Sequence, residues 1–133
     1  MKKVRPLGNR FRIYAGFLTF MLALAVMGLS VEATAADSAE KYKVDASIVC
    51  MVNDNVMGRT QIPVEVEGKT YYGCCKNCVG KLKGNIAVRT AKDPFSGNDV
   101  DKASAFIIEG PKGEALYFES AVTANKFIAK YSK

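Results

Sequence analysis

The alternation of apolar and polar residues first indicates a β-hairpin in the middle of the chain. Residues 62–67 alternate between apolar side chains and proline or glutamate, the period-two pattern of a strand with one solvent-facing side. Pro63 places this strand at a sheet edge or at its own start. Gly68-Lys69 then turns the chain, and the β-forming residues 70–72 begin a return strand. We predict a hairpin that delivers Cys74 at its far end.

A short helix, a second hairpin and a final helix are predicted to follow. Residues 76–83 have the pattern of a short helix, weakened by internal glycine. The apolar runs 103–108 and 115–118 flank a turn rich in glycine and proline, which predicts the second hairpin. Ser120 can cap a helix through its hydroxyl, and apolar residues recur behind it at helical spacing. The predicted fold class is α+β, with β-hairpins and short helices.

The segment between the helix and the second hairpin is predicted to be a loop. Residues 93–99 are dense in turn-forming residues, and their acidic members lack the spacing and the closing glutamate of an EF-hand calcium loop. Turn chemistry therefore explains the segment better than a calcium site. We expect Asp93, Asp99 and Asp101 to be solvated, because nothing in the loop indicates burial.

The N-terminal segment has the order of a secretory signal peptide. Basic residues within 1–12 precede the nearly uninterrupted apolar, uncharged run 13–31, and Ala33-Thr34-Ala35 supplies a peptidase site. A retained membrane anchor is the alternative, because about 20 apolar residues span a bilayer. In both cases the rest of the chain is predicted to lie outside the cytoplasm, in the periplasm or secreted.

The chain is thus predicted to have three parts: a signal peptide over 1–35, a flexible lead-in over 36–47 and one cysteine-containing domain over 48–133. Cleavage after Ala35 leaves 98 residues, which can build one modest core and exclude a large multi-domain enzyme. The net charge then falls from +6 to +2, with 14 basic and 12 acidic residues. No cluster of lysine and arginine remains to follow phosphates, so we expect no nucleic-acid partner and, after cleavage, no membrane contact.

The unusual feature of the predicted domain is its cysteine content. Cys50, Cys74, Cys75 and Cys78 are the four cysteines, and the sequence has no histidine. The usual general base, the Ser/His and Cys/His nucleophile pairs and histidine-rich metal sites are therefore excluded. Any metal would be held mainly by thiolates, and soft sulfur ligands select Cu(I) or Zn(II) over Mg²⁺ or Ca²⁺.

The spacing of the cysteines predicts one shared site. Cys74 and Cys78 are four residues apart across a strand-to-helix junction, so both sulfurs can point to one spot at the helix start, where backbone N–H groups favour thiolates. Cys50 is expected to arrive from the other side of the hairpin as a third ligand. Cys75 is either a fourth ligand after rearrangement or a spare thiol.

Two other uses of the cysteines remain open. An even number of cysteines in a small exported domain is typical of structural disulfides. Three thiols within five residues, two of them adjacent, fit a two-bridge framework poorly. A redox pair is the second alternative, with Cys75 attacking and Cys78 resolving, although no thioredoxin-like β-α-β pattern surrounds it.

The segment 48–105 resembles the TRASH/YHS group of small metal-binding domains, and specifically its exported branch. The resemblance rests on Cys50, a gap of 23 residues, and then an aromatic strand that leads into Cys74 and Cys78. It implies a treble-clef-like metal site with these three cysteines as ligands and a role in handling copper or another heavy metal. The gap is slightly long, and Cys75 stands where many relatives have serine. The final hairpin and helix are similar to those of NosL-type copper-binding proteins.

Together these observations predict an exported protein that binds one Cu(I) or Zn(II) ion per domain and is not an enzyme. Met51 and Met57 flank the first cysteine; thioethers bind Cu(I), but methionine more often fills a core. The ion would be sensed, buffered or passed to a metal-handling protein. A disulfide-stabilised module without metal and a thiol-disulfide oxidoreductase are the alternatives.

Overall fold

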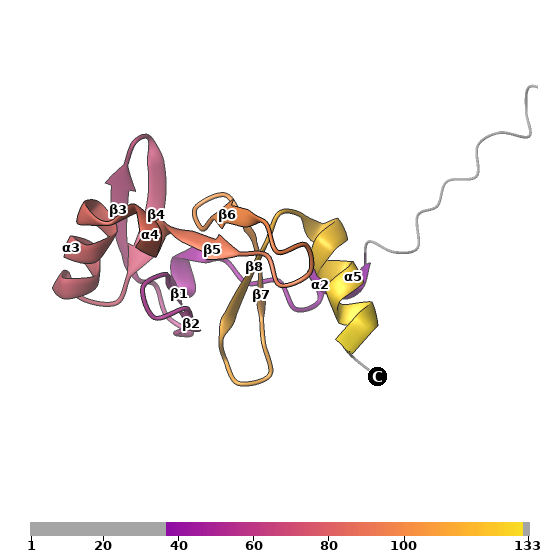
Figure 1. Cartoon of the computed structure of the whole chain (residues 1–133). Helices are drawn as coiled ribbons and strands as arrows, with labels where there is room; N and C mark the ends of the chain where they lie inside the picture. The colour runs from indigo at the N-terminus through magenta and orange to yellow at the C-terminus, as the bar shows by residue number, and fades with distance from the viewer. Residues whose placement is uncertain (1–36, 132–133) are drawn as a thin grey trace, which may run out of the picture. The chain divides into compact units, whose positions relative to one another are not determined.

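The structure is a computed structural model that describes residues 37–131. Short antiparallel hairpins joined by short helices build this part of the chain. The predicted signal peptide and its alternative, a membrane anchor over 13–31, lie outside these residues. Within 37–131, no helix has the length and apolar character needed to cross a bilayer. The elements in chain order are α2 (Asp37–Glu40), the 3-10 helix η1 (Ala46–Ile48), β1 (Val49–Cys50), β2 (Asn55–Val56), β3 (Ile62–Val66), β4 (Lys69–Gly73), α3 (Lys76–Gly84), α4 (Ile86–Arg89), β5 (Thr90–Lys92), β6 (Asp99–Asp101), β7 (Phe106–Glu109), β8 (Ala115–Phe118) and α5 (Ala121–Tyr131) (Figure 1).

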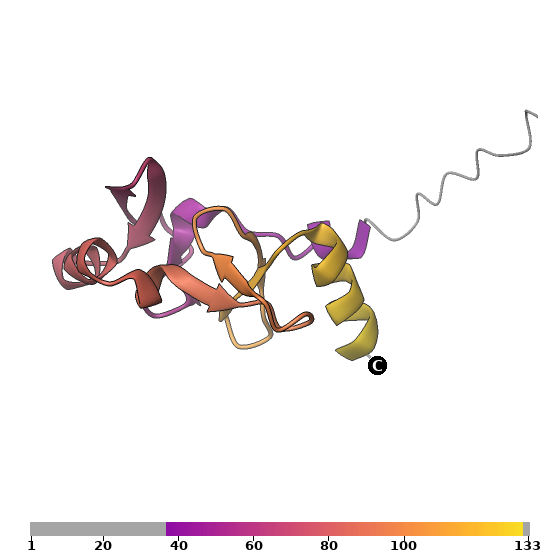
Figure 2. The ribbon, with the colours of Figure 1, turned by 45° about the horizontal axis from the view of Figure 1, so that its top comes forward.

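The strands pair only with their neighbours along the chain. β1 pairs with β2, β3 with β4, β5 with β6, and β7 with β8, each pair antiparallel. Helix α3 packs on the β3–β4 hairpin, while α5 packs on α2 and on the β7–β8 hairpin, an arrangement visible in both views (Figures 1 and 2). The predicted fold class, a small α+β domain with β-hairpins and short helices, is confirmed.

The β3–β4 hairpin has the geometry that its sequence pattern predicts. Its closing residues, Glu67 and Gly68, both have positive φ angles, 53° and 74°, as a two-residue type I′ turn requires. The turn thus begins one residue earlier than predicted, and Lys69 belongs to β4. Val64 and Tyr71 pair directly across the strands and are both buried, while Glu65 remains exposed. The alternation therefore reflects one buried and one solvated face.

Two apolar clusters form the core of the described residues. The smaller one joins α2, the β7–β8 hairpin and α5, and it includes Phe118, whose ring lies 5.4 Å from that of Phe127. The larger one lies among the hairpins and α3, and it contains fully buried Met51 and Leu82. The interpretation of Met51 as a core residue is therefore confirmed. Met57 is half-buried.

The two helices after Cys74 and Ser120 occur where they were predicted. Helix α3 covers the predicted residues and extends to Gly84. Ser120 Oγ accepts a hydrogen bond from the Thr123 N–H at 3.4 Å, which is the predicted cap of α5. Along the apolar face of α5, exposure to solvent increases from fully buried Ala124 to mostly exposed Tyr131.

Helix α2 was not predicted from the sequence. It lies in the segment 36–47, for which a flexible lead-in was expected. Ala39 of α2 is fully buried, and the side chain of Asn125 in α5 accepts hydrogen bonds from the Ala39 N–H (2.9 Å) and the Ser38 hydroxyl (2.8 Å). A contact with a residue 86 positions away cannot be inferred from a short polar segment alone.

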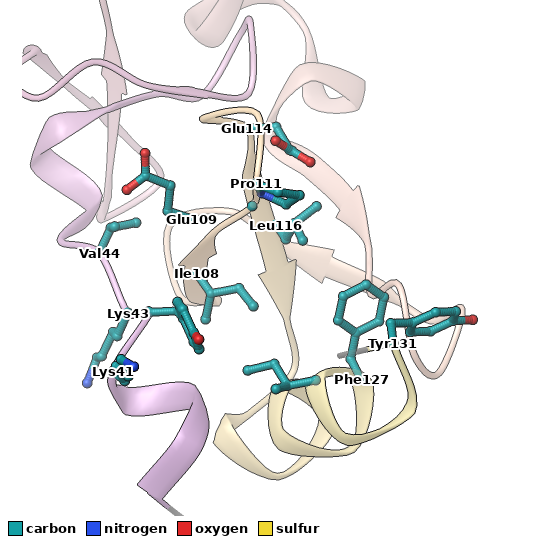
Figure 3. A pocket seen from close by; sticks show the side chains of 13 residues that line it. Lys41, Lys43, Val44, Ile108, Glu109, Pro111, Glu114, Leu116, Phe127 and Tyr131 are labelled. Atoms are coloured by element: carbon teal, nitrogen blue, oxygen red, sulfur yellow. The ribbon is translucent and has the colours of Figure 1, made fainter. Parts of the chain in front are cut away.

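A cavity of about 740 Å³ lies beside α5 and the β7–β8 hairpin. Its apolar lining includes Val44, Ile108 and Phe127, and lysine and glutamate side chains stand around it (Figure 3). None of the four cysteines lines this cavity.

The prediction that Asp93 is solvated is wrong. Its side chain is only 1 % exposed and accepts hydrogen bonds from the backbone N–H groups of Phe95 (2.7 Å), Ser96 (3.1 Å) and Glu119 (2.9 Å). Burial by itself raises the pKa of Asp93, but the N–H groups of Glu119 and Phe95 outweigh it and lower the pKa below its usual value. Asp93 therefore organises its own loop and ties that loop to the end of β8.

We predict that Asp93→Asn lowers the free energy of unfolding by about 1–3 kcal/mol at pH 7, because an amide cannot accept all three N–H bonds. The lowered pKa of Asp93 adds stability above the ordinary carboxyl pKa, and this stability is lost as pH falls through the folded-state pKa. Urea unfolding at pH 7 and at pH 3 measures both effects. The difference in the free energy of unfolding between variant and wild type should be smaller at pH 3. An equal difference at both pH values would contradict the assignment.

Candidate metal centre

The first cysteine of the candidate site lies at the end of β1. Cys50 is fully buried, and the turn that follows it returns the chain to β2. Burial raises the pKa of the Cys50 thiol, but the backbone N–H groups of Asn53, Cys74 and Val52 outweigh it and lower the pKa. A tight turn whose N–H groups face a sulfur atom stabilises a thiolate, which is the form that binds a metal ion.

The other three cysteines occupy the junction between β4 and α3. Cys74 follows the last residue of β4 and is half-buried, Cys75 is the N-cap residue of α3 and is exposed, and Cys78 is buried in the first turn of α3. The Met51 N–H donates to the Tyr72 carbonyl at 2.9 Å, and this bond ties the Cys50 turn to β4. The hairpin and the helix thus bring two distant segments of chain together.

Three of the four sulfur atoms converge. The Sγ of Cys78 lies 3.9 Å from that of Cys50 and 3.6 Å from that of Cys74, and all three sulfurs lie within 4.8 Å of one another. Thiolates that hold a metal ion tetrahedrally at about 2.3 Å are about 3.8 Å apart. The three sulfur atoms are therefore spaced as ligands of one soft ion, and this group could hold such an ion.

Cys75 is near this group without being part of it. Its sulfur lies 3.6 Å from the Cys78 sulfur, yet the mutually close set consists of Cys50, Cys74 and Cys78. All four described cysteines are free thiols, and these separations exceed the roughly 2.05 Å of a disulfide bond. Cys75 is thus an additional exposed thiol beside the group of three.

The neighbouring thiols affect one another's pKa values in opposite directions, raising those of Cys74 and Cys78 and helping to lower those of Cys50 and Cys75. Burial, together with its contacts to Cys74 and Cys75, raises the pKa of Cys78 to about 12. Contact with Cys50 is the main cause that raises the pKa of Cys74. The backbone N–H of Cys78, at the helix start, lowers the pKa of Cys75. A cation bound among the sulfurs would displace the remaining protons and stabilise the thiolates, so the donor set fits a thiophilic ion.

Gly73 allows the helix to approach the strand this closely. A Cβ atom at this position would lie 3.0 Å from Cys78 Cβ and 3.3 Å from the Val79 nitrogen. These contacts are tighter than ordinary van der Waals separations, and one of them is to helix backbone. Gly73 therefore sets the distance between the end of β4 and the first turn of α3.

A buried lysine, Lys102, holds the turn that follows Cys50 through hydrogen bonds to two of its residues. Lys102 is 4 % exposed, and its ammonium donates to the Met51 carbonyl at 2.8 Å and to the Asp54 carboxylate at 2.5 Å. The same ammonium lies 5.1 Å from the centre of the Tyr117 ring. Asp54 has a positive φ of 53°, and its carbonyl accepts a hydrogen bond from the Ala115 N–H. The β7–β8 side of the domain thus positions the turn that carries Cys50.

Comparison with known proteins finds no matching family model, no matching curated protein and no matching solved structure. The resemblance to the TRASH/YHS group therefore has only the cysteine spacing and the geometry of a small α+β domain to support it. What the structure shows of that resemblance is a cysteine triad able to bind a metal ion.

The structure places the sequence-predicted cysteines as follows. Cys50, Cys74 and Cys78 come together from the predicted directions, and Cys75 lies at their exposed side. Sequence analysis missed Gly73 and Lys102, because neither carries a motif. The aromatic residues before Gly73 were noted as strand formers and as part of the resemblance, neither of which indicates a close approach of the helix, and an isolated lysine gives no signal of burial.

We predict that Gly73→Ala lowers the free energy of unfolding by about 1–3 kcal/mol, as overpacking of a filled site does, and weakens metal binding because α3 is pushed from β4. Gly80→Ala in the same helix is the matched control. Nothing lies within 4 Å of a Cβ there, so it should stabilise the helix by about 0.5–1 kcal/mol. Thermal unfolding and competitive metal titration measure both variants. Equal behaviour of the two would show that the close approach is unimportant.

We also predict that Lys102→Met loosens the Cys50 turn. The buried Met51 carbonyl loses its donor, which costs about 1–3 kcal/mol of folding stability, and metal affinity falls by about 10–100-fold, as when a ligand loses its supporting partner. Lys112→Met changes the same side-chain chemistry at an exposed position and should leave affinity unchanged. The two variants are compared by competition with a chromogenic chelator, and unaltered affinity in Lys102→Met would contradict the positioning role.

Proposed function

We propose that this chain is an exported protein that binds one Cu(I) or Zn(II) ion through Cys50, Cys74 and Cys78. The observation that carries the proposal is the convergence of these three sulfurs within 4.8 Å of one another from two segments of chain. Export is supported by the basic, apolar and small-residue order of the first 36 residues. The periplasm or the extracellular space is therefore the proposed location.

The donor set favours Cu(I). Three thiolates suit Cu(I), whereas a fourth ligand, from Cys75 or water, would complete a tetrahedral Zn(II) site. Met51 is fully buried in the core, so methionine sulfur adds little to this preference. The preference for copper rests on the three sulfurs, on the proposed location outside the cytoplasm and on the resemblance to copper-handling domains.

We propose binding and transfer of the ion in preference to catalysis. The chain has no histidine to act as a general base. The cavity beside α5 is lined by residues other than the cysteines. The ion would be sensed, buffered or delivered to another metal-handling protein.

Thiol-disulfide exchange is a second candidate function. Cys75 is exposed at the N-cap of a helix, and its sulfur lies 3.6 Å from that of Cys78. An oxidoreductase would reduce insulin disulfides, lose this activity in Cys75→Ser and keep it in Cys50→Ser. The metal-binding function requires the opposite order of importance among the cysteines.

We predict that the exported domain binds one equivalent of Cu(I) or Zn(II), measured by titration and elemental analysis under reducing conditions. Cys50→Ser removes a ligand and should weaken binding by more than the roughly 10–100-fold loss caused by removing a group that only supports a ligand. Cys75→Ser is the matched control and should retain the stoichiometry.

Two outcomes would contradict the proposed function. One is a wild-type protein that retains no metal and has no free thiols without reductant, which would show a disulfide-stabilised module. The other is unchanged affinity in Cys50→Ser, which would show that Cys50 does not take part.

A further inference from the structure

The four thiols differ in their exposure to solvent. Cys50 is 0 % exposed and Cys78 is 5 % exposed, whereas Cys74 is half-buried and Cys75 is exposed. Among the four thiols, those of Cys74 and Cys75 are therefore the ones that solvent or a partner can reach. The exposed side of the site coincides with the start of α3.

Cys75 is placed to exchange with Cys74 as a ligand. The Cys78 sulfur lies 3.6 Å from the sulfur of each of them. Cys78 therefore has two neighbouring thiols: Cys74, which belongs to the group of three with Cys50, and Cys75, which is close to Cys78 alone. Such an arrangement lets an ion change partners without ever losing its buried ligand.

The surface around this exposed thiol is basic. No aspartate or glutamate occurs between Lys69 and Lys92, a segment that contains the cysteines, α3 and α4. Lys69 and Lys92 pair with acidic residues of β6. The exposed lysines of α3 make no salt bridge with any described residue; they are Lys76, Lys81 and Lys83.

Helix stability does not explain all three lysines. Lys81 and Lys83 lie in the last turn of α3, where a positive charge stabilises the helix dipole. Lys76 is the first helical residue, where a positive charge is unfavourable, and no acidic residue occupies the first turn. Lys76 is also directly beside Cys75. Stabilisation of the helix dipole therefore does not account for Lys76.

An exposed apolar side chain lies on the neighbouring helix α4. Ile86, at the start of α4, is 69 % exposed, more than any other large hydrophobic residue among those described. Helix α4 contacts α3. A basic surface with one exposed apolar residue beside a reactive thiol has the composition of a polar docking site for a protein.

We propose that the exposed face of α3, with Lys76, Lys81 and Lys83, docks an acidic protein that carries a soft metal site, and that Cys75 passes the ion between the two proteins. This inference rests on the proposed function, because it assigns the partner and the exit route of the same metal site. Opposite charges would bring the partner's thiols to the start of α3.

The transfer is a ligand exchange without oxidation or reduction. The Cys75 thiolate forms a bond to Cu(I) as the bonds from Cys74 and Cys50 break, which leaves the ion between Cys75 and Cys78. Two thiolates of the partner then bind in turn as Cys78 and finally Cys75 release the ion. Cys75 gives up a proton when it binds and regains one when it releases the ion. The two partner thiols give up two protons, and Cys50, Cys74 and Cys78 take up three, the third from water. The copper remains Cu(I) throughout.

The experiment measures Cu(I) transfer from the loaded domain to two synthetic acceptor peptides. Each has one Cys-x-x-Cys pair, flanked by glutamates in one peptide and by lysines in the other. Rapid mixing, separation and copper analysis give the rates. At low ionic strength we expect transfer to the glutamate peptide to be at least about tenfold faster, as electrostatic steering provides, and this advantage should shrink as salt is added.

Matched variants separate the charge from the thiol. Replacing Lys76, Lys81 and Lys83 with glutamine should abolish the preference for the glutamate peptide. Replacing Lys112, Lys126 and Lys130, which are exposed on other elements, changes the net charge equally and should preserve it. Cys75→Ser should slow transfer to both peptides by about tenfold, since thiol reactivity follows exposure, while the bound copper stays at one equivalent.

The outcomes that overturn the inference are distinct from those that overturn the proposed function. An unchanged rate in Cys75→Ser, or a loss of stoichiometry there, shows that Cys75 is not the relay. Equal rates with both peptides, or equal effects of the two lysine triples, show that α3 is not the docking face. Binding to phosphatidylglycerol vesicles is measured for the same variants. If the variant with Lys76, Lys81 and Lys83 replaced loses vesicle binding but keeps the preference for the glutamate peptide, the exposed surface of α3 binds a membrane and the inference is overturned. A wild-type domain that binds no metal overturns the proposed function itself.

Discussion

The close approach of α3 to the end of β4 is the constraint on which the site depends. A strand that ends in glycine lets the first turn of the helix lie within van der Waals contact of the backbone, so the Cys78 sulfur comes within 3.6 Å of that of Cys74. The Met51–Tyr72 hydrogen bond brings the Cys50 turn to the same strand. With a side chain at position 73, the helix and its buried thiol would have to move away from the other two sulfurs.

The remainder of the described domain holds the Cys50 turn in place. A turn of four residues has little packing of its own, and its carbonyls need partners once they are buried. The Lys102 ammonium supplies one donor for both Met51 and Asp54, and it is itself buried beneath Tyr117. The Cys50 turn is therefore held by a side chain from the turn that follows β6, in a distant part of the chain, which helps to explain how a small domain keeps three thiols together before an ion binds.

Local patterns predicted the elements that are long enough to show a period. The alternation at 62–67, the helix after Cys75 and the cap at Ser120 all appear as expected, and so does the convergence of Cys50 with Cys74 and Cys78. Strands of two or three residues, such as β1 and β6, are too short to show one. Long-range contacts, such as those of Ala39, Asp93 and Lys102, bury groups that local composition marks as solvated.

X-ray absorption at the metal edge of the zinc-loaded exported domain tests the central claim most directly, because it counts the sulfur atoms around the ion. Convergence of Cys50, Cys74 and Cys78 predicts at least three sulfur neighbours at about 2.3 Å, a fourth being Cys75 where it completes the zinc site, and one sulfur fewer in Cys50→Ser. A spectrum with one or two sulfurs in the wild type, or the same count in both proteins, would contradict a shared site built from two distant parts of the chain.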